Sequence, residues 1–132
     1  MKNLRYFVSS LLIFLTMALV GCGGSTRVNI DMSELSSYAV QSEVMKMQKS
    51  STAQEYLGKT IKMRAKPYAD GDYHYIIGPD GDECCNWEIE IQLSEDLESY
   101  PKSGKNTYVT GKYNYYKEGG RTYYYLELIE YT

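Results

Sequence analysis

The stretch TYVTGKYNYYKEGGRTYYYLELIEY, residues 107–131, decides the fold because its two halves alternate apolar and polar positions around a Gly-Gly pair. Side chains of a strand point alternately to its two faces, so each half is predicted to be a strand with one buried face. With the turn centred between Glu118 and Gly119, the predicted facing pairs are Tyr113 with Tyr124, Gly111 with Leu126, and Val109 with Leu128. Apolar residues then meet apolar residues throughout, which favours a hairpin of residues 107–116 and 121–131.

The opposite face of this hairpin is polar but rich in tyrosine. The chain has 15 Tyr, of which 14 follow residue 21, and that part of the chain has one Trp and no Phe. A tyrosine offers a ring and a hydroxyl, which suits a half-wet binding face, although Tyr also simply fills strand positions in a chain that lacks Phe. Four outward tyrosines are therefore candidate contacts for sugar rings or a peptide chain: Tyr108, Tyr116, Tyr123 and Tyr125.

Three further strands are predicted upstream of the hairpin. Residues 59–66 alternate apolar and basic side chains, residues 73–78 follow a turn at residues 70–72, and residues 85–93 show the clearest alternation. The buried side of this last strand is predicted to consist of Cys85, Trp87, Ile89, Ile91 and Leu93. Five short strands in one domain predict a mainly β fold, a small five-stranded barrel whose edges are closed.

A helical segment is predicted before the first strand. Asp31, followed three residues later by Glu34, has the pattern of a capping box. An apolar stripe follows at helical spacing: Val40, Val44 and Met47. Residues 52–55 repeat the capping pattern, and Gly58 is predicted to end this short second helix.

The N-terminus has the pattern of a secretory signal. Lys2 and Arg5 precede an apolar run over residues 7–20, and Cys22 comes directly after it and a glycine. The run spans 14 residues, whereas a membrane-spanning helix needs about 20. The sequence Leu19-Val20-Gly21-Cys22 resembles the lipobox of bacterial lipoproteins.

That resemblance implies that residues 1–21 are a signal peptide that is removed, and that Cys22 carries diacylglycerol and fatty-acyl chains such as palmitate. The expected location is the cell membrane, with the lipid anchor at Cys22 and the domain on the extracytoplasmic side. Residues 22–30 are predicted to be a flexible tether because Gly and Ser are frequent at its start. Residues 31–132 are then the barrel domain with its N-terminal helix.

Charge excludes some functions. Lys2 and Arg5 are the charged residues of positions 1–21, so the rest of the chain has 12 Lys and Arg against 17 Asp and Glu, a formal charge of −5. Nucleic acid is not expected as a partner, because an acidic domain lacks the basic footprint for phosphate backbones.

An enzyme and a cofactor are not expected either, because the chain has one His and no nucleophile elbow. Glu88 and Glu90 alternate as acidic residues commonly do on the wet side of a strand.

The adjacent pair Cys84-Cys85 permits three interpretations. The first is a buried Cys85 beside an exposed Cys84 thiol, since adjacent strand residues point to opposite faces. The second is a strained vicinal disulfide, whose Cα atoms lie closer together than those of ordinary disulfides. The third is a soft-metal site with His74, which lies diagonally from Cys85 if Ile76 faces Cys85 across a turn at residues 79–82. The acidic turn residues are weaker candidates for calcium: Asp70, Asp72, Asp80, Asp82 and Glu83.

Residues 58–63 (GKTIKM) and Gly111 resemble features of the OB-fold, in which a bare backbone relieves crowding where a strand bends sharply. This resemblance covers about residues 56–131 and implies a five-stranded OB-like barrel. The lipobox, the sequence Tyr-Leu-Gly-Lys-Thr at 56–60, and Cys84-Cys85 before Ile89-Glu90-Ile91 together resemble a group of uncharacterised bacterial OB-like lipoproteins. That resemblance implies a fold and a location but no activity.

The expected function is therefore a membrane-anchored binding or interaction module for a small ligand, a glycan or an envelope protein. The alternative is a redox- or metal-responsive module centred on Cys84-Cys85. The tyrosine-rich strands favour the first function, and the cysteine pair favours the second.

Overall fold

The alternating patterns form strands around one core in a computed structural model of the chain, which describes residues 26–79 and 86–132. The elements follow one another as β1 (Ile30–Asp31), helix α2 (Ser37–Gln48), 3-10 helix η2 (Ala53–Glu55), β2 (Thr60–Asp70), β3 (Tyr73–Ile77), β4 (Glu88–Leu93), β5 (Thr107–Glu118) and β6 (Arg121–Tyr131). Within these two ranges, no helix combines the length and apolar character needed to cross a membrane.

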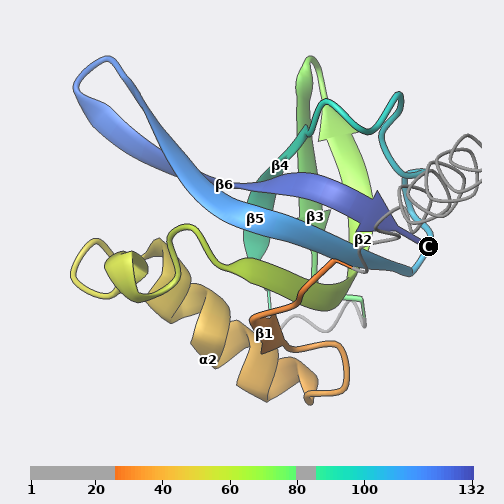
Figure 1. Cartoon of the computed structure of the whole chain (residues 1–132), viewed down its shortest axis with the longest axis horizontal. Coiled ribbons are helices and arrows are strands. Elements are labelled where there is room, and N and C mark those ends of the chain that lie inside the picture. Colours follow the sequence, from red (N-terminus) through yellow and green to blue (C-terminus); the bar gives the residue numbers. More distant parts are fainter. Residues whose placement is uncertain (1–25, 80–85) are drawn as a thin grey trace, which may run out of the picture.

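The six strands of the described chain form one sheet in the order β1-β2-β3-β4-β6-β5, and β2 also pairs with β5. This additional pairing joins the two ends of the row that runs from β2 to β5, so the sheet closes partly into a ring (Figure 1). Neighbouring strands are antiparallel, except that β1 lies parallel to β2 and β4 lies parallel to β6. The predicted mainly β, barrel-like fold with a preceding helical segment is confirmed, and the two-residue β1 is an additional strand.

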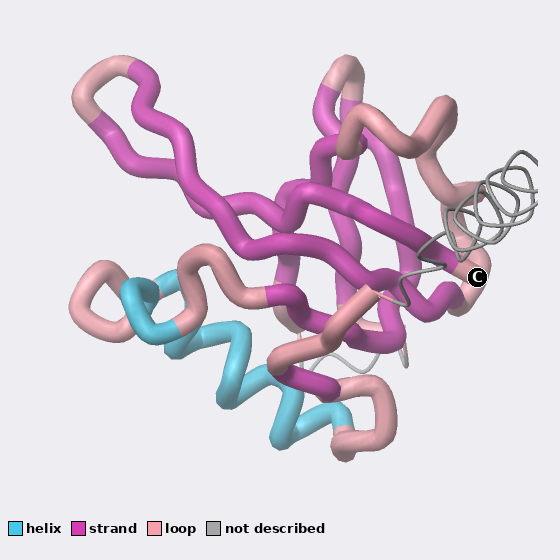
Figure 2. The backbone as a smooth tube through the Cα atoms, viewed as in Figure 1, coloured by secondary structure: helices cyan, strands magenta, loops and turns pink. Residues whose placement is uncertain are grey.

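The core fills the ring and extends to α2, which lies below the strands (Figure 2). Alternate residues of the long strands are buried there: Ile61, Met63, Ala65, Ile76, Ile89, Ile91, Val109, Tyr113, Leu126 and Leu128. The helix contributes its predicted stripe of Val40, Val44 and Met47. The hydroxyl of Tyr113 donates a 2.9 Å hydrogen bond to the carbonyl oxygen of Met47, which ties the helix to the barrel.

The β5–β6 hairpin has the predicted faces but a different register. Tyr113 faces Leu126 instead of Tyr124, so the predicted register is wrong by two residues. The cause is the turn, because Gly119 and Gly120 have φ values of 56° and 76°, as both central residues of a type I′ turn require. The turn is centred between the two glycines, one residue later than predicted. A shift of two residues leaves every side chain on its predicted face, because the side-chain period of a strand is two.

Gly111 lies at an irregularity of the same hairpin. The register changes between Thr110 and Gly111, which leaves Ile129 of β6 without a directly facing residue. A Cβ atom at Gly111 would lie 2.6 Å from Cγ of Leu126 and 2.7 Å from the carbonyl oxygen of Glu127. The bare backbone expected at this position is therefore required by close packing between the two strands.

Helix α2 begins later than the sequence predicts. Its N-cap is Ser36, whose hydroxyl oxygen accepts a 3.3 Å hydrogen bond from the backbone nitrogen of Ala39. Asp31 instead ends β1, and its carboxylate accepts a 2.9 Å hydrogen bond from the backbone nitrogen of Ser33. The predicted capping box at Asp31 is wrong, because pairing with β2 holds this residue in an extended conformation and its side chain makes an Asx turn.

The chain enters the domain along β2. The backbone nitrogen of Asn29 donates a 2.8 Å hydrogen bond to the carbonyl oxygen of Thr60, and the side-chain oxygen of Asn29 accepts a 2.9 Å bond from the Thr60 nitrogen. Met32 donates its backbone N–H to the carbonyl oxygen of Lys62 at 2.8 Å. The last two residues of the predicted tether, Asn29 and Ile30, are thus held at the sheet.

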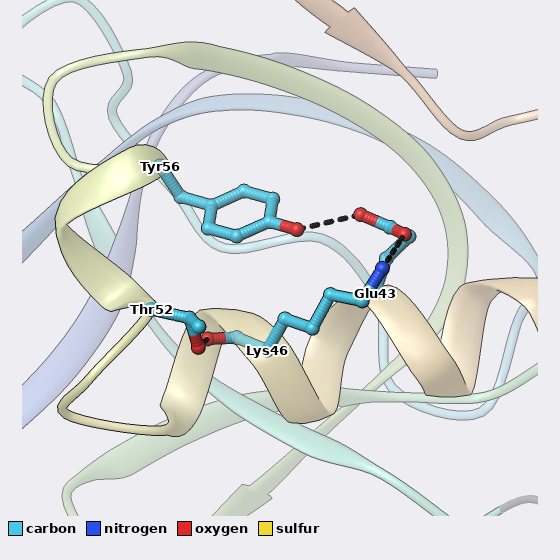
Figure 3. Close-up of polar contacts among 4 residues, drawn as sticks. All are labelled: Glu43, Lys46, Thr52 and Tyr56. Atoms are coloured by element: carbon cyan, nitrogen blue, oxygen red, sulfur yellow. Dashed lines mark hydrogen bonds and ion pairs between the residues drawn. The ribbon is translucent and has the colours of Figure 1, made fainter.

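The connection between α2 and η2 is fixed by side chains (Figure 3). The hydroxyl of Tyr56 donates a 2.6 Å hydrogen bond to Glu43, which also forms a 2.9 Å ion pair with Lys46. The predicted capping of η2 by the Thr52 side chain is wrong, because Thr52 makes no side-chain capping hydrogen bond. Its hydroxyl instead donates a 2.6 Å hydrogen bond to the carbonyl oxygen of Lys46. That carbonyl lies in the last turn of α2, where backbone acceptors lack helical partners. Gly58, with a φ of 78°, ends the segment as predicted.

Candidate functional site

The strand order brings a row of polar and aromatic side chains together on the outside of the barrel. Tyr68 of β2 pairs with Tyr75 of β3, and Tyr75 pairs with Glu90 of β4. Glu90 pairs in turn with Tyr125 of β6, whose other neighbour is Asn114 of β5. Strands lie about 4.8 Å apart, so this row extends about 19 Å around the sheet. It is the central line of a larger surface, on which the neighbouring outward positions carry further tyrosines and glutamates.

We define the tyrosine face by the outward residues on and beside this row: Tyr68, Tyr73, Tyr75, Glu88, Glu90, Gln92, Tyr116, Tyr123 and Tyr125. Its rings pack in two groups. Tyr68 and Tyr75 stack with their centroids 5.3 Å apart, and Tyr116 and Tyr123 stack at the same distance. Tyr125 is tilted by 52° against Tyr116, with 5.9 Å between the centroids. These separations lie in the range that aromatic pairs prefer.

Two carboxylates lie between the two groups of rings. The hydroxyl of Tyr68 donates a hydrogen bond to Glu88, and that of Tyr116 donates a 2.8 Å bond to Glu90. Gln92 donates its amide to the second oxygen of Glu90 at 3.1 Å. Burial, followed by the hydrogen bonds to the two glutamates, raises the pKa of Tyr68 and of Tyr116 well above the ordinary value. Both phenols therefore stay protonated at neutral pH and remain hydrogen-bond donors to the carboxylates.

An open recess of about 350 Å³ adjoins the tyrosine face at the end of the β3–β4 ladder. Residues of the face and their neighbours on β3, β4 and the following connection line it: Asp72, Tyr73, His74, Glu90, Ile91, Gln92, Leu93 and Tyr100. The ring of Tyr100, from the connection between β4 and β5, stacks on His74 with 3.5 Å between the centroids and 2° between the planes. The His74 ring is thereby held in place at the edge of the recess.

Three of the four predicted ligand tyrosines come together. Tyr116, Tyr123 and Tyr125 belong to the tyrosine face, whereas Tyr108 lies apart from them. Tyr108 pairs with Arg64 of β2, and the ammonium of Lys62 lies 5.8 Å from its ring centroid. It precedes Tyr116 by eight residues of one strand, which is about 26 Å.

Sequence reasoning missed three of the six tyrosines of the face, Tyr68, Tyr73 and Tyr75. Tyr68 and Tyr75 are outward neighbours of buried strand residues, so the alternation of β2 and β3 indicates their direction. What a sequence pattern does not indicate is that β4 lies between β3 and β6, and that neighbourhood is what places Glu90 between Tyr75 and Tyr125.

The predicted register between the strands before and after the cysteine pair is wrong. Ile76 faces Ile89, and His74 faces Ile91, which is six residues beyond Cys85. The connection is longer than the tight turn that the prediction assumed, because the ladder begins only at Ile77 and Glu88. Cys84, Cys85, Asp80, Asp82 and Glu83 lie outside the described residues, so the interpretations of the cysteine pair and of the calcium candidates remain predictions.

Within residues 26–79 and 86–132, no group of three or more His, Cys, Asp or Glu is placed to hold a metal ion. The signal peptide and the lipidation site Cys22 also fall outside these ranges and remain predictions. Comparison with models of known protein families and with curated proteins finds no match to this chain.

Proposed function

We propose that the protein is a binding module whose ligand lies over the tyrosine face. The observation that carries this proposal is the cross-strand row from Tyr68 through Tyr75 and Glu90 to Tyr125, in which one carboxylate lies among three tyrosine rings on the outside of the sheet. Aromatic rings on a sheet supply contact area at little conformational cost, and carboxylates supply directional acceptors. The adjoining recess adds a concave region in which part of a ligand can be enclosed.

The position of the face in the barrel supports this proposal by analogy. β3 and β4 are the second and third strands of the five-stranded barrel, and OB-folds use this face and two adjacent loops for ligands. The loops that correspond are the turn at residues 70–72 and the β5–β6 turn at Gly119-Gly120.

The proposed location follows from the sequence alone. We infer that Cys22 carries a lipid anchor, that the chain belongs with the bacterial OB-like lipoproteins that it resembles, and that the face binds a ligand or envelope protein outside the cytoplasm. Mass spectrometry of the protein from its native membrane tests this, because cleavage before Cys22 with addition of acyl chains is the expected result. A chain that retains residues 1–21 would contradict it.

Two tyrosines of β5 and β6 offer a matched test of the binding face. Tyr123 on the face and Tyr108 away from it are 37% and 38% exposed, so their replacement removes similar exposed ring area. Detergent-solubilised protein is immobilised, and retention of envelope glycans and proteins is compared for Tyr123→Ser and Tyr108→Ser. We expect Tyr123→Ser to weaken retention about tenfold, in line with the loss of one stacking contact, and Tyr108→Ser to leave it unchanged. Equal effects of the two variants would exclude the face as the binding surface.

A further inference from the structure

The centre of the tyrosine face is acidic. The outward positions of β3, β4 and β6 between residues 73 and 127 carry three carboxylates, Glu88, Glu90 and Glu127. They carry one cation, Arg121, which lies at the hairpin turn and pairs with Glu118 of β5. Glu127 faces Lys112 of β5, which supplies a nearby cation. Glu88 and Glu90 accept hydrogen bonds from neutral groups, and neither forms an ion pair with a described Lys or Arg. Among the residues that the structure describes, these two negative charges in the middle of the face therefore have no cationic partner.

Glu90 lies between two tyrosine rings. Tyr75 and Tyr125 are its directly paired neighbours on the two adjacent strands, and directly paired residues have Cβ atoms about 5 Å apart. A cation bound to the Glu90 carboxylate thus lies within reach of both ring faces, and tyrosine rings attract cations within about 6 Å. A carboxylate flanked by two aromatic rings is suited to an ammonium or guanidinium group.

The carboxylates of Glu88 and Glu90 follow one another along β4 at the spacing of alternate residues in an extended chain. Glu88 and Glu90 are two residues apart in one strand, which is about 6.7 Å. Alternate side chains on one side of an extended peptide repeat at the same distance. Gln92, the next outward residue, borders the recess of about 350 Å³, so a third position of such a peptide reaches that recess.

We propose that the ligand of the tyrosine face is an extended basic peptide segment, with Lys or Arg at alternate positions bound by Glu88 and Glu90 between the tyrosine rings. This inference rests on the proposed binding function and names its partner chemistry. A neutral ligand that displaces water from both carboxylates returns hydrogen bonds alone, whereas a cation returns hydrogen bonds and an opposite charge.

The test measures binding of synthetic peptides to the detergent-solubilised full chain by calorimetry. One peptide is acetyl-Lys-Thr-Lys-Thr-Lys-amide, and its partner has acetyllysine at each lysine, which removes the charge and keeps the length. We expect the lysine peptide to bind, and the acetyllysine peptide to bind at least about tenfold more weakly, because each lost ion contact in this setting is worth about 1–2 kcal/mol. Raising sodium chloride from about 50 mM to about 500 mM should weaken the lysine peptide alone.

A pair of charge-removing variants locates the effect. Glu90→Gln keeps the shape of the side chain and its ability to accept from Tyr116, and it should weaken the lysine peptide about tenfold. Glu98→Gln removes the same charge from an exposed residue in the connection after β4 and should leave binding unchanged. Equal binding of the two peptides, no binding of either, or equal effects of the two variants would overturn the proposal.

A neutral oligosaccharide, chitohexaose, distinguishes failure of this inference from failure of the binding function. If chitohexaose binds, loses affinity with Tyr123→Ser and is insensitive to Glu90→Gln, the face is a binding surface but its ligand is not a basic peptide. If Tyr123→Ser and Glu90→Gln change the binding of no probe, both proposals are wrong.

Discussion

The inner and outer faces of the β5–β6 hairpin use the same residue type for different purposes. Tyr113 points inward, is 1% exposed, and donates its hydroxyl to the backbone of α2. Tyr116, three residues later, points outward and donates its hydroxyl to a carboxylate beside other rings. The hydroxyl of Tyr113 satisfies a carbonyl at the end of α2, whereas the hydroxyl of Tyr116 bonds to Glu90 while its ring stays on the outer face. The face of the sheet, not the residue type, therefore decides whether a tyrosine is buried in the core or keeps its ring on the surface.

The largest difference between the two faces is expected at neighbouring positions of β5. Gly111→Ala places a methyl group 2.7 Å from a backbone oxygen of β6, and we expect it to lower the free energy of unfolding by about 3 kcal/mol. Lys112→Ala changes the adjacent outward residue and should change the same quantity by less than about 0.5 kcal/mol. Urea denaturation followed by circular dichroism measures both. A Gly111→Ala variant as stable as Lys112→Ala would show that the strands separate easily at this point.

A second test removes one hydroxyl from each face. Tyr113→Phe leaves the Met47 carbonyl without its partner, and we expect it to lower the free energy of unfolding by about 1–2 kcal/mol. Tyr116→Phe removes a bond to a carboxylate that water can reach, so about 0.5 kcal/mol or less is expected. Chemical denaturation of the two variants gives the comparison. If the outer variant is the less stable one, the assignment of stability to the inner face is wrong.

A third test concerns Tyr56, which contacts Glu43 of α2 and for which a smaller effect than for Tyr113 is expected. Burial, followed by the hydrogen bond to Glu43, raises the pKa of Tyr56 to about 12, and the same bond is the main cause of the lowered pKa of Glu43. Tyr56→Phe should cost about 1 kcal/mol or less at neutral pH. A raised folded-state pKa contributes stability below pH 10 that is lost as pH rises toward 12, and the lowered Glu43 pKa contributes stability that is lost as pH falls below 4.5.

The difference in free energy of unfolding between the wild type and Tyr56→Phe should therefore be constant between about pH 5 and pH 10. It should decrease below about pH 5 and above about pH 10. Denaturant midpoints measured across this pH range test it, and the other tyrosines cancel because both proteins contain them. A difference that grows above pH 10 would contradict the direction of the Tyr56 shift.

The sequence predicted what depends on the period of two. The buried faces of β2, β4, β5 and β6 follow directly from alternating residues, and the hairpin error of two residues did not change them. The predicted registers were wrong where the register depends on turn geometry, as at Gly119-Gly120, or on the length of a connection, as between Ile77 and Glu88. The predicted start of α2 was wrong because Asp31 pairs with Lys62 of β2, which lies far along the chain.

The candidate site was predictable only in part for a related reason. Tyr116, Tyr123 and Tyr125 belong to one hairpin, so local pattern was enough to group them. Glu90 and Tyr75 join them only through the parallel pairing of β4 with β6, which no local pattern encodes. Tyr108 shares the outward direction of Tyr116, but the length of β5 separates the two.

The parallel pairing of β1 with β2 has a mechanical consequence. A pull applied to the chain before Asn29 acts along β1, and the hydrogen bonds to Thr60 and Lys62 resist it together in shear. The load then passes into β2, which is bonded on its other side to the barrel, before it reaches α2. A force from the N-terminal side therefore reaches the helix and the tyrosine face only after the hydrogen bonds between β1 and β2 break.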